Sequence, residues 1–76
     1  MIEPVPVYMV GRKGEPTGLV HYVLSNQDGQ VDFAPKGKRA MCGRTLIRYI
    51  DDKRQTVTCR ACLERKAAWE SNNAKS

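Results

Sequence analysis

The chain has 76 residues, which is enough for one small domain, and 41% of them are hydrophobic, as in globular rather than disordered proteins. A chain this short seldom folds on its core alone, so we expect a metal ion or a cross-link to stabilise it. Thirteen Lys and Arg against eight Asp and Glu give a formal charge of +5, which favours polyanions or acidic surfaces as partners. The longest apolar runs have about six residues, so we expect no membrane-spanning helix.

The N-terminal segment predicts one strand followed by a loop. Residues 4–10 are β-branched and aromatic, but Pro4 and Pro6 lack an N–H donor, so this segment suits only an edge strand. Residues 11–18 are dense in Gly and other turn residues and predict a loop. The start of the chain has neither a basic region nor an apolar core of a secretory signal, so we expect a cytoplasmic protein.

The next part predicts a second strand, a turn and a basic loop. Residues 19–24 predict a strand. Alternation of side chains places three of its residues on one face: Leu19, His21 and Val23. Residues 25–29 predict a turn, after which residues 30–33 are expected to return as a short antiparallel strand. Residues 34–40 are expected to form a basic loop.

A β-hairpin and one helix are expected in the second half. Residues 45–50 and 55–58 are β-prone, and the four polar residues 51–54 suit the connection between them. Residues 60–70 contain strong helix formers and no Gly or Pro, with Thr58 placed to cap the helix. Helical spacing puts five residues on its inner face: Cys59, Cys62, Leu63, Lys66 and Trp69.

These elements predict a single domain over residues 1–70, followed by a polar, disordered tail over residues 71–76. Charge is unevenly distributed between its halves. Residues 1–34 carry two basic and four acidic side chains, whereas residues 35–76 carry eleven basic and four acidic ones. Scattered surface charges usually serve solubility only, but this asymmetry favours a binding surface. Its candidate residues are Lys36, Lys38, Arg39, Arg44, Arg48, Lys53, Arg54 and Arg60.

The cysteines and the single histidine predict a metal site. Three cysteines are an odd number, and a cytoplasmic chain keeps its thiols reduced, so metal binding is a better explanation than disulfides. Cys59 and Cys62 form a CxxC at the start of the predicted helix, and Cys42 precedes Gly43, which permits a tight turn. Taken alone, His21 would suit a core position. Together with three cysteines it completes a closed four-ligand site for one structural Zn²⁺.

Two resemblances follow from these residues. His21, the Cys42-Gly43 pair and the stretch 57–63 together resemble the pattern of small His-Cys-Cys-Cys zinc proteins of phages and actinobacteria. Over residues 41–69, the order of Cys-Gly turn, hairpin and CxxC-opened helix also resembles the treble-clef zinc finger. A treble clef has two ligands on its knuckle, whereas Cys42 stands alone here. The resemblance implies a small zinc-stabilised α+β domain with short antiparallel strands, a β-hairpin and one C-terminal helix.

Enzymatic alternatives lack the residues that they require. A thioredoxin-like redox pair needs a parallel sheet that this chain is too short to build. Zinc deaminases need a glutamate two residues after the histidine, where this chain has Val23. Metal-dependent nucleases on a treble clef need further histidines, and no phosphate-binding glycine motif precedes a helix. We therefore expect a non-enzymatic module.

Two kinds of partner remain open for such a module. The basic residues could neutralise phosphates of a nucleic acid in a regulatory role. Alternatively, the chain is a regulator that docks on the acidic surface of a protein, as a phage protein docks on a host enzyme. Four aromatic residues could stack on bases, although in so thin a core they more often pack inside: Tyr22, Phe33, Tyr49 and Trp69.

Overall fold

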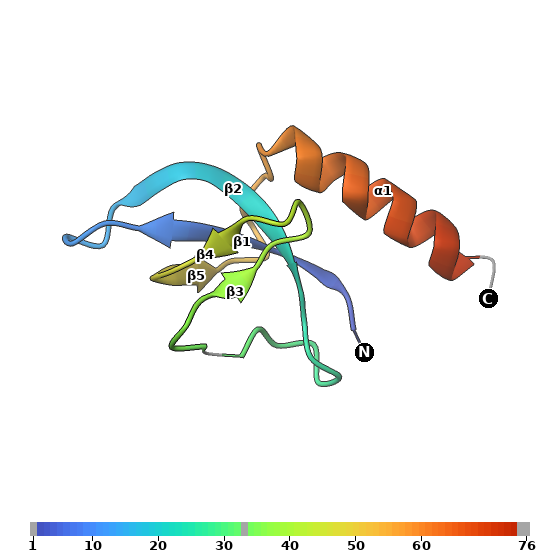
Figure 1. Cartoon of the computed structure of the whole chain (residues 1–76), viewed down its shortest axis with the longest axis horizontal. Helices are drawn as coiled ribbons and strands as arrows, with labels where there is room; N and C mark the ends of the chain where they lie inside the picture. Colours follow the sequence, from blue (N-terminus) through green and yellow to red (C-terminus); the bar gives the residue numbers. More distant parts are fainter. Residues whose placement is uncertain (1, 33, 75–76) are drawn as a thin grey trace.

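The structure is a computed structural model that describes residues 2–32 and 34–74 (Figure 1). Its elements are β1 (Pro4–Val10), β2 (Pro16–Leu24), β3 (Lys38–Arg39), β4 (Thr45–Leu46), β5 (Tyr49–Asp51) and α1 (Arg60–Ala74). Strands β2, β1 and β5 form an antiparallel sheet in that order, and β3 pairs with β4 in a separate hairpin. The predicted α+β class, with antiparallel strands and one C-terminal helix, is confirmed.

Strand β1 lies at the centre of its sheet, so the prediction of an edge strand is wrong. It pairs with β2 along its whole length but with β5 only through residues 7–9. The N–H and C=O of one residue point to the same side of a strand, and the Pro6 carbonyl accepts a hydrogen bond from the Asp52 N–H, just beyond β5. Pro4 and Pro6 therefore lie beyond the part of β1 that pairs with β5, so their lack of an N–H donor removes no hydrogen bond between these two strands.

Strand β2 begins three residues earlier than predicted, so the hairpin loop from β1 is confined to residues 11–15. A register shift in the pairing with β1 leaves Gly18 and Leu19 out of the ladder. Gly18 has a φ of 69°, a conformation that few other residues adopt. This bulge turns Leu19 outward, with 49% of its surface exposed, while His21 and Val23 are buried on one face as predicted.

The predicted return strand at residues 30–33 does not form over residues 30–32, and residue 33 lies outside the described part of the chain. The Asn26 side chain instead accepts hydrogen bonds from the N–H groups of Asp28 (2.9 Å) and Gln30 (3.1 Å). An asparagine bonded in this way closes a turn by itself. The chain then continues without a strand until β3.

The hairpin predicted over residues 45–58 is wrong. Strand β4 pairs with β3, which precedes it in the chain and lies in the predicted basic loop. Strand β5 pairs with β1. Residues 55–58 form no strand. The observed hairpin, residues 38–46, surrounds Cys42, and we call it the knuckle hairpin. It forms there because the chain reverses at residues 40–44, where the Ala40 N–H donates to the Arg44 carbonyl (2.8 Å).

Helix α1 begins at Arg60 as predicted but continues to Ala74. Residues 71–74 are therefore helical rather than part of a disordered tail, since they contain no Gly or Pro to end the helix. Residues 75–76 lie outside the described part. Cys62 is fully buried, but Leu63, predicted to face inward, is 42% exposed. The helix packs only its first turns beside β2 and then leaves the sheet (Figure 1).

The core lies between the sheet, the knuckle hairpin and the start of α1. Its buried apolar residues are Val5, Val7, Val23, Ala40, Leu46, Val57, Cys59 and Cys62. His21 and Ser25 are the buried polar residues among those described. No helix in the described part of the chain is long and apolar enough to cross a membrane. Because the aliphatic core is this small, the cluster of His21 and the cysteines makes up a large share of the buried interior.

Candidate metal centre

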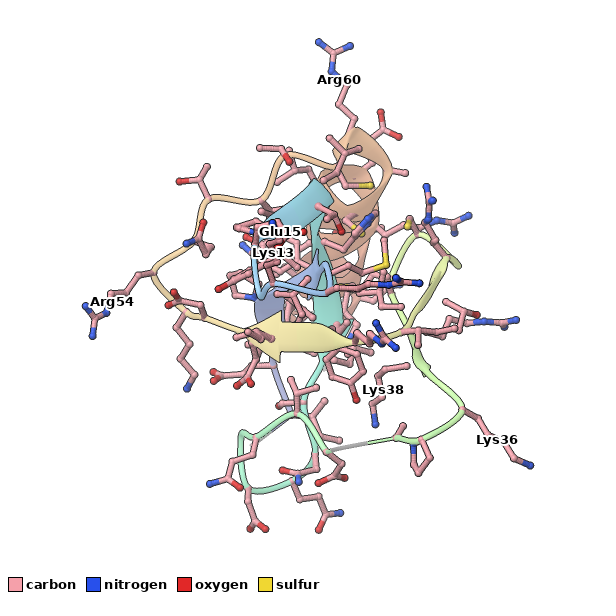
Figure 2. All side chains as sticks on the ribbon, turned by 90° about the vertical axis from the view of Figure 1, so that its left-hand side faces the viewer. Lys13, Glu15, Lys36, Lys38, Arg54 and Arg60 are labelled. Carbon is pink, nitrogen blue, oxygen red and sulfur yellow. The ribbon has the colours of Figure 1, made fainter. Side chains whose placement is uncertain are left out.

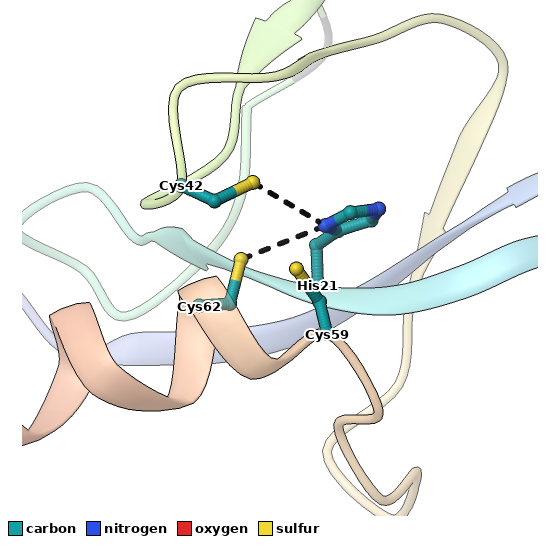
Figure 3. Close-up of side chains that lie close together, drawn as sticks. All are labelled: His21, Cys42, Cys59 and Cys62. Carbon is teal, nitrogen blue, oxygen red and sulfur yellow. Dashed lines mark hydrogen bonds between the residues drawn. The ribbon is translucent and has the colours of Figure 1, made fainter.

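The structure brings His21, Cys42, Cys59 and Cys62 together from three separate elements (Figure 3). His21 comes from β2, Cys42 from the turn of the knuckle hairpin, and the other two from the start of α1. The His21 Nδ1 atom lies 3.6 Å from the Cys42 Sγ and 3.5 Å from the Cys62 Sγ. One potential ligand atom from each of the four residues lies within 4.8 Å of all the others. The four residues can therefore hold a metal ion.

These distances fit a tetrahedral ion. With bonds of about 2.3 Å to sulfur and about 2.05 Å to nitrogen, tetrahedral angles separate a nitrogen from a sulfur by about 3.6 Å and two sulfurs by about 3.8 Å. The two nitrogen–sulfur distances match this value. All three cysteines are free, so no disulfide competes for their sulfur atoms. A donor set of three sulfurs and one nitrogen, without a carboxylate, is typical of structural zinc.

The knuckle hairpin places Cys42 by backbone hydrogen bonds. The Gly43 N–H donates to the Ala40 carbonyl (2.9 Å), and Gly43 adopts a φ of 95°, which closes the turn. The Met41 N–H donates to the Tyr22 carbonyl (2.8 Å), next to His21 in β2. The turn is thus attached directly to the strand that carries the histidine.

The start of α1 is attached to the same strand at Val20, the residue that precedes His21. The N–H groups of Thr58 and Cys59 both donate to the Val20 carbonyl (3.1 Å each). The Thr58 hydroxyl accepts a hydrogen bond from the Val20 N–H (3.0 Å), so it ties the chain to β2 and does not cap the helix as predicted. The Cys59 carbonyl accepts the first helical bond, from the Leu63 N–H. Residues on both sides of His21 therefore position the ligands.

Burial and neighbouring groups shift the pKa values of His21, Cys42 and Cys62. Burial, and then the positive charge of Arg44, lower the pKa of His21 from 6.5, so its ring is neutral near pH 7. Burial raises the pKa of the Cys62 thiol to about 12. Burial also acts to raise the pKa of Cys42, but the backbone N–H of Arg44 and the neighbouring thiols outweigh it and lower that pKa. A neutral imidazole and a thiol that needs a cation to ionise suit metal binding.

The basic residues fall into two sets. Five lie in residues 34–50, which we call the basic segment: Lys36, Lys38, Arg39, Arg44 and Arg48. The other three lie elsewhere: Lys53 pairs with Glu3 (3.2 Å), Arg54 lies in the turn after β5, and Arg60 is at the start of α1. Figure 2 shows Arg54 and Arg60 pointing away from Lys36 and Lys38. The eight predicted residues therefore do not form one patch.

A small pocket beside the basic segment was not expected from the sequence. It has a volume of about 270 Å³ and is lined by Ala34, Pro35, Ile47, Arg48 and Tyr49. The Tyr49 hydroxyl donates to the Asp32 carbonyl (2.7 Å) and accepts from the Ala34 N–H (3.1 Å). These bonds hold the two walls of the pocket together. The one signal in the sequence was the pair of isoleucines around Arg48 and Tyr49, which suggested only a strand.

The other aromatic candidates differ in position. Tyr22 is half-buried, and the Lys66 ammonium lies 5.3 Å from its ring centroid. Trp69 is half-buried on α1, and Phe33 lies outside the described residues.

No protein family, curated protein or solved structure matches this chain. Function is therefore inferred from the geometry of the residues themselves.

Proposed function

We propose that the chain is a non-enzymatic, zinc-stabilised binding module that holds one structural Zn²⁺ at His21, Cys42, Cys59 and Cys62. The support is the close approach of four nitrogen and sulfur donors within 4.8 Å of one another, with two nitrogen–sulfur distances that match tetrahedral spacing. Four protein ligands leave no position for a substrate or an activated water, which is the arrangement of structural rather than catalytic zinc. A ligand on a glycine turn and two at a helix start make the module treble-clef-like, although its hairpin contains the knuckle instead of following it.

We further propose that this module binds nucleic acid through the basic segment, in a regulatory role. The segment carries five cations and no acidic residue, whereas the rest of the chain carries eight of each sign. The whole formal charge of +5 is therefore concentrated in 17 residues around the knuckle hairpin. Among the described residues, none of these five cations forms an ion pair. Unpaired cations concentrated in this way favour a polyanion as the partner.

A salt titration with two matched double variants tests this proposal. Lys36→Glu/Arg48→Glu reverses two exposed cations of the basic segment, and Arg12→Glu/Lys13→Glu reverses two exposed cations in the β1–β2 loop. Both variants change the net charge equally. The first should weaken binding strongly and lower the slope of log K against log salt by about 1.8 on duplex or about 1.4 on single strands. The second should change binding much less.

Zinc content is measured in every variant, so that a loss of binding is not confused with a loss of fold. Equal weakening by the two variants would mean that only net charge attracts the polyanion, and would contradict the assignment to the basic segment. If the zinc-loaded parent bound neither DNA nor RNA at ~50 mM salt, nucleic acid would be rejected as the partner. Capture of an acidic protein from a nuclease-treated lysate would then identify the alternative class of partner.

A further inference from the structure

The pocket at the basic segment combines an apolar interior with cations at its edge. Ala34, Pro35 and Ile47 supply aliphatic walls, and the exposed cationic residue Arg48 also lines the pocket. Ile47 is 60% exposed, the highest value among the large apolar residues that the structure describes as exposed. An apolar surface that is left open beside unpaired cations suits a ligand that carries both a flat apolar group and an anion.

Lys36 and Lys38 flank a backbone position that lies close to the same pocket. Lys36 follows the lining residue Pro35 directly, and the two lysines flank Gly37. A Cβ atom built on Gly37 would lie only 3.3 Å from the Ile47 Cγ1, so the backbone between the lysines packs against the pocket wall. Figure 2 shows both lysines on the same side of the molecule. The stretch of chain that carries both lysines therefore lies beside the pocket.

The pocket is small and its walls are fixed. Its volume of about 270 Å³ is below the range of about 300–1,000 Å³ that is usual for drug-sized ligands, so it suits a single ring system. Tyr49 is held by two hydrogen bonds through its hydroxyl, which leaves its ring as an ordered wall. Arg48 has a φ of 54°, an uncommon conformation for a residue with a side chain, and such positions cluster at ligand sites.

We propose that this pocket receives one unpaired base of a single-stranded nucleic acid, while Arg48, Lys36 and Lys38 contact the flanking phosphates. The proposal rests on the nucleic-acid function proposed above and specifies its form. A base within a duplex is stacked and paired on its edges, so it cannot enter a recess of this kind without being extruded. In a single strand the base is available, and the phosphates on both sides of it lie within reach of long basic side chains beside the pocket.

Two comparisons test the inference, both made by fluorescence anisotropy on zinc-loaded protein. The first uses labelled strands of about twelve nucleotides, a length within the site sizes of small single-strand binders. Oligothymidylate and oligouridylate are compared with an abasic strand of the same length and charge. Loss of the bases should weaken binding by about fivefold to a hundredfold, because the phosphates are unchanged and only base contacts are lost. Whichever of the two sugars binds better identifies the strand type.

The second comparison uses matched isoleucine variants. Ile47→Ser changes a pocket wall, and Ile50→Ser changes an isoleucine that is 43% exposed and does not line the pocket. We expect Ile47→Ser to weaken binding of the base-containing strand by about three- to tenfold, with no effect on the abasic strand. Ile50→Ser should leave both affinities unchanged.

The outcomes separate the two proposals. Equal affinity for abasic and base-containing strands, or equal effects of the two serine variants, would overturn the pocket assignment but leave nucleic-acid binding intact. Tighter binding to a duplex than to a single strand would also overturn it. Absence of binding to every strand and duplex would reject the proposed function itself, and the pocket assignment with it. Zinc content and circular dichroism of each serine variant show that the fold is retained.

Discussion

Removal of zinc should unfold this chain. Its fully or nearly buried aliphatic residues are Val5, Val7, Val23, Leu46 and Val57. Each contributes about 1.5–3 kcal/mol by burial, so all five together provide about as much as the ~10–16 kcal/mol of a structural zinc ion. The ion therefore supplies about half of the favourable energy of the interior, and the remaining core cannot offset the chain entropy alone. Chelation should abolish the cooperative thermal transition, as measured by circular dichroism.

Substitution of His21 tests the same reasoning at a single ligand. If ~10–16 kcal/mol is shared by four ligands, each supplies about 2.5–4 kcal/mol, so His21→Ala should weaken zinc binding by roughly a hundred- to a thousandfold. His21→Cys restores a fourth ligand and should regain most of that affinity. Ser25→Ala removes the other buried polar side chain, which lies outside the cluster, and should leave zinc affinity unchanged. Parent-like affinity in His21→Ala, or a zinc-free chain that melts cooperatively, would refute the reasoning.

Three further predictions concern the same centre. Free cysteine thiols have a pKa of about 8.5 and are protonated at pH 7. Zinc binding to the unfolded, zinc-free chain must therefore displace thiol protons, and calorimetry in buffers of different ionisation enthalpy should show release of about two to three protons per ion. Burial lowers the pKa of His21 below 6.5, so on acidification the unfolded chain takes up a proton before the folded chain does. Stability and zinc retention should therefore be complete above pH 6.5 and should fall below it. Zinc release measured between pH 8 and 4 follows this change. Gly43 and Gly14 both have positive φ with open space around them, so alanine at either should cost about 1–2 kcal/mol in thermal unfolding, but only Gly43→Ala should weaken zinc binding, and equal zinc affinities would place the knuckle turn outside the site.

The cluster of four potential ligands could be predicted from the sequence because it depends on local geometry. A CxxC at a helix start and a cysteine before a glycine each orient a thiolate within a few residues, and no other histidine was available. Alternation in β2 also placed His21 correctly on the buried face. The hydrogen bonds that hold the site together were not predictable in this way. Thr58 has the residue type of a helix cap, and only its position beside Val20 gives it another role.

Strand pairing was predicted less well because it depends on distant partners. The β tendency of residues 45–50 was correct, but the chain splits it between β4 and β5, which pair with different strands. The prolines of β1 suggested an edge, since nothing in the sequence shows that β5 ends before reaching them. The pocket was missed for a similar reason. It forms only where residues 34–35 meet residues 47–49, and neither stretch has a pattern that indicates a cavity.

The metal centre also determines how the basic segment is presented. Strands β3 and β4 have two residues each, and an isolated hairpin of that size is not stable in water. The knuckle hairpin is held by burial of Ala40 and Leu46, by the Met41–Tyr22 hydrogen bond and by Cys42 in the cluster. Arg44 links the cluster to the basic segment, because its backbone N–H acts to lower the pKa of the Cys42 thiol while its exposed side chain belongs to the basic segment. Under the proposed function, zinc would not contact the nucleic acid but would fix the spacing of the cations that bind it, so we expect the metal and the polyanion to bind with positive coupling.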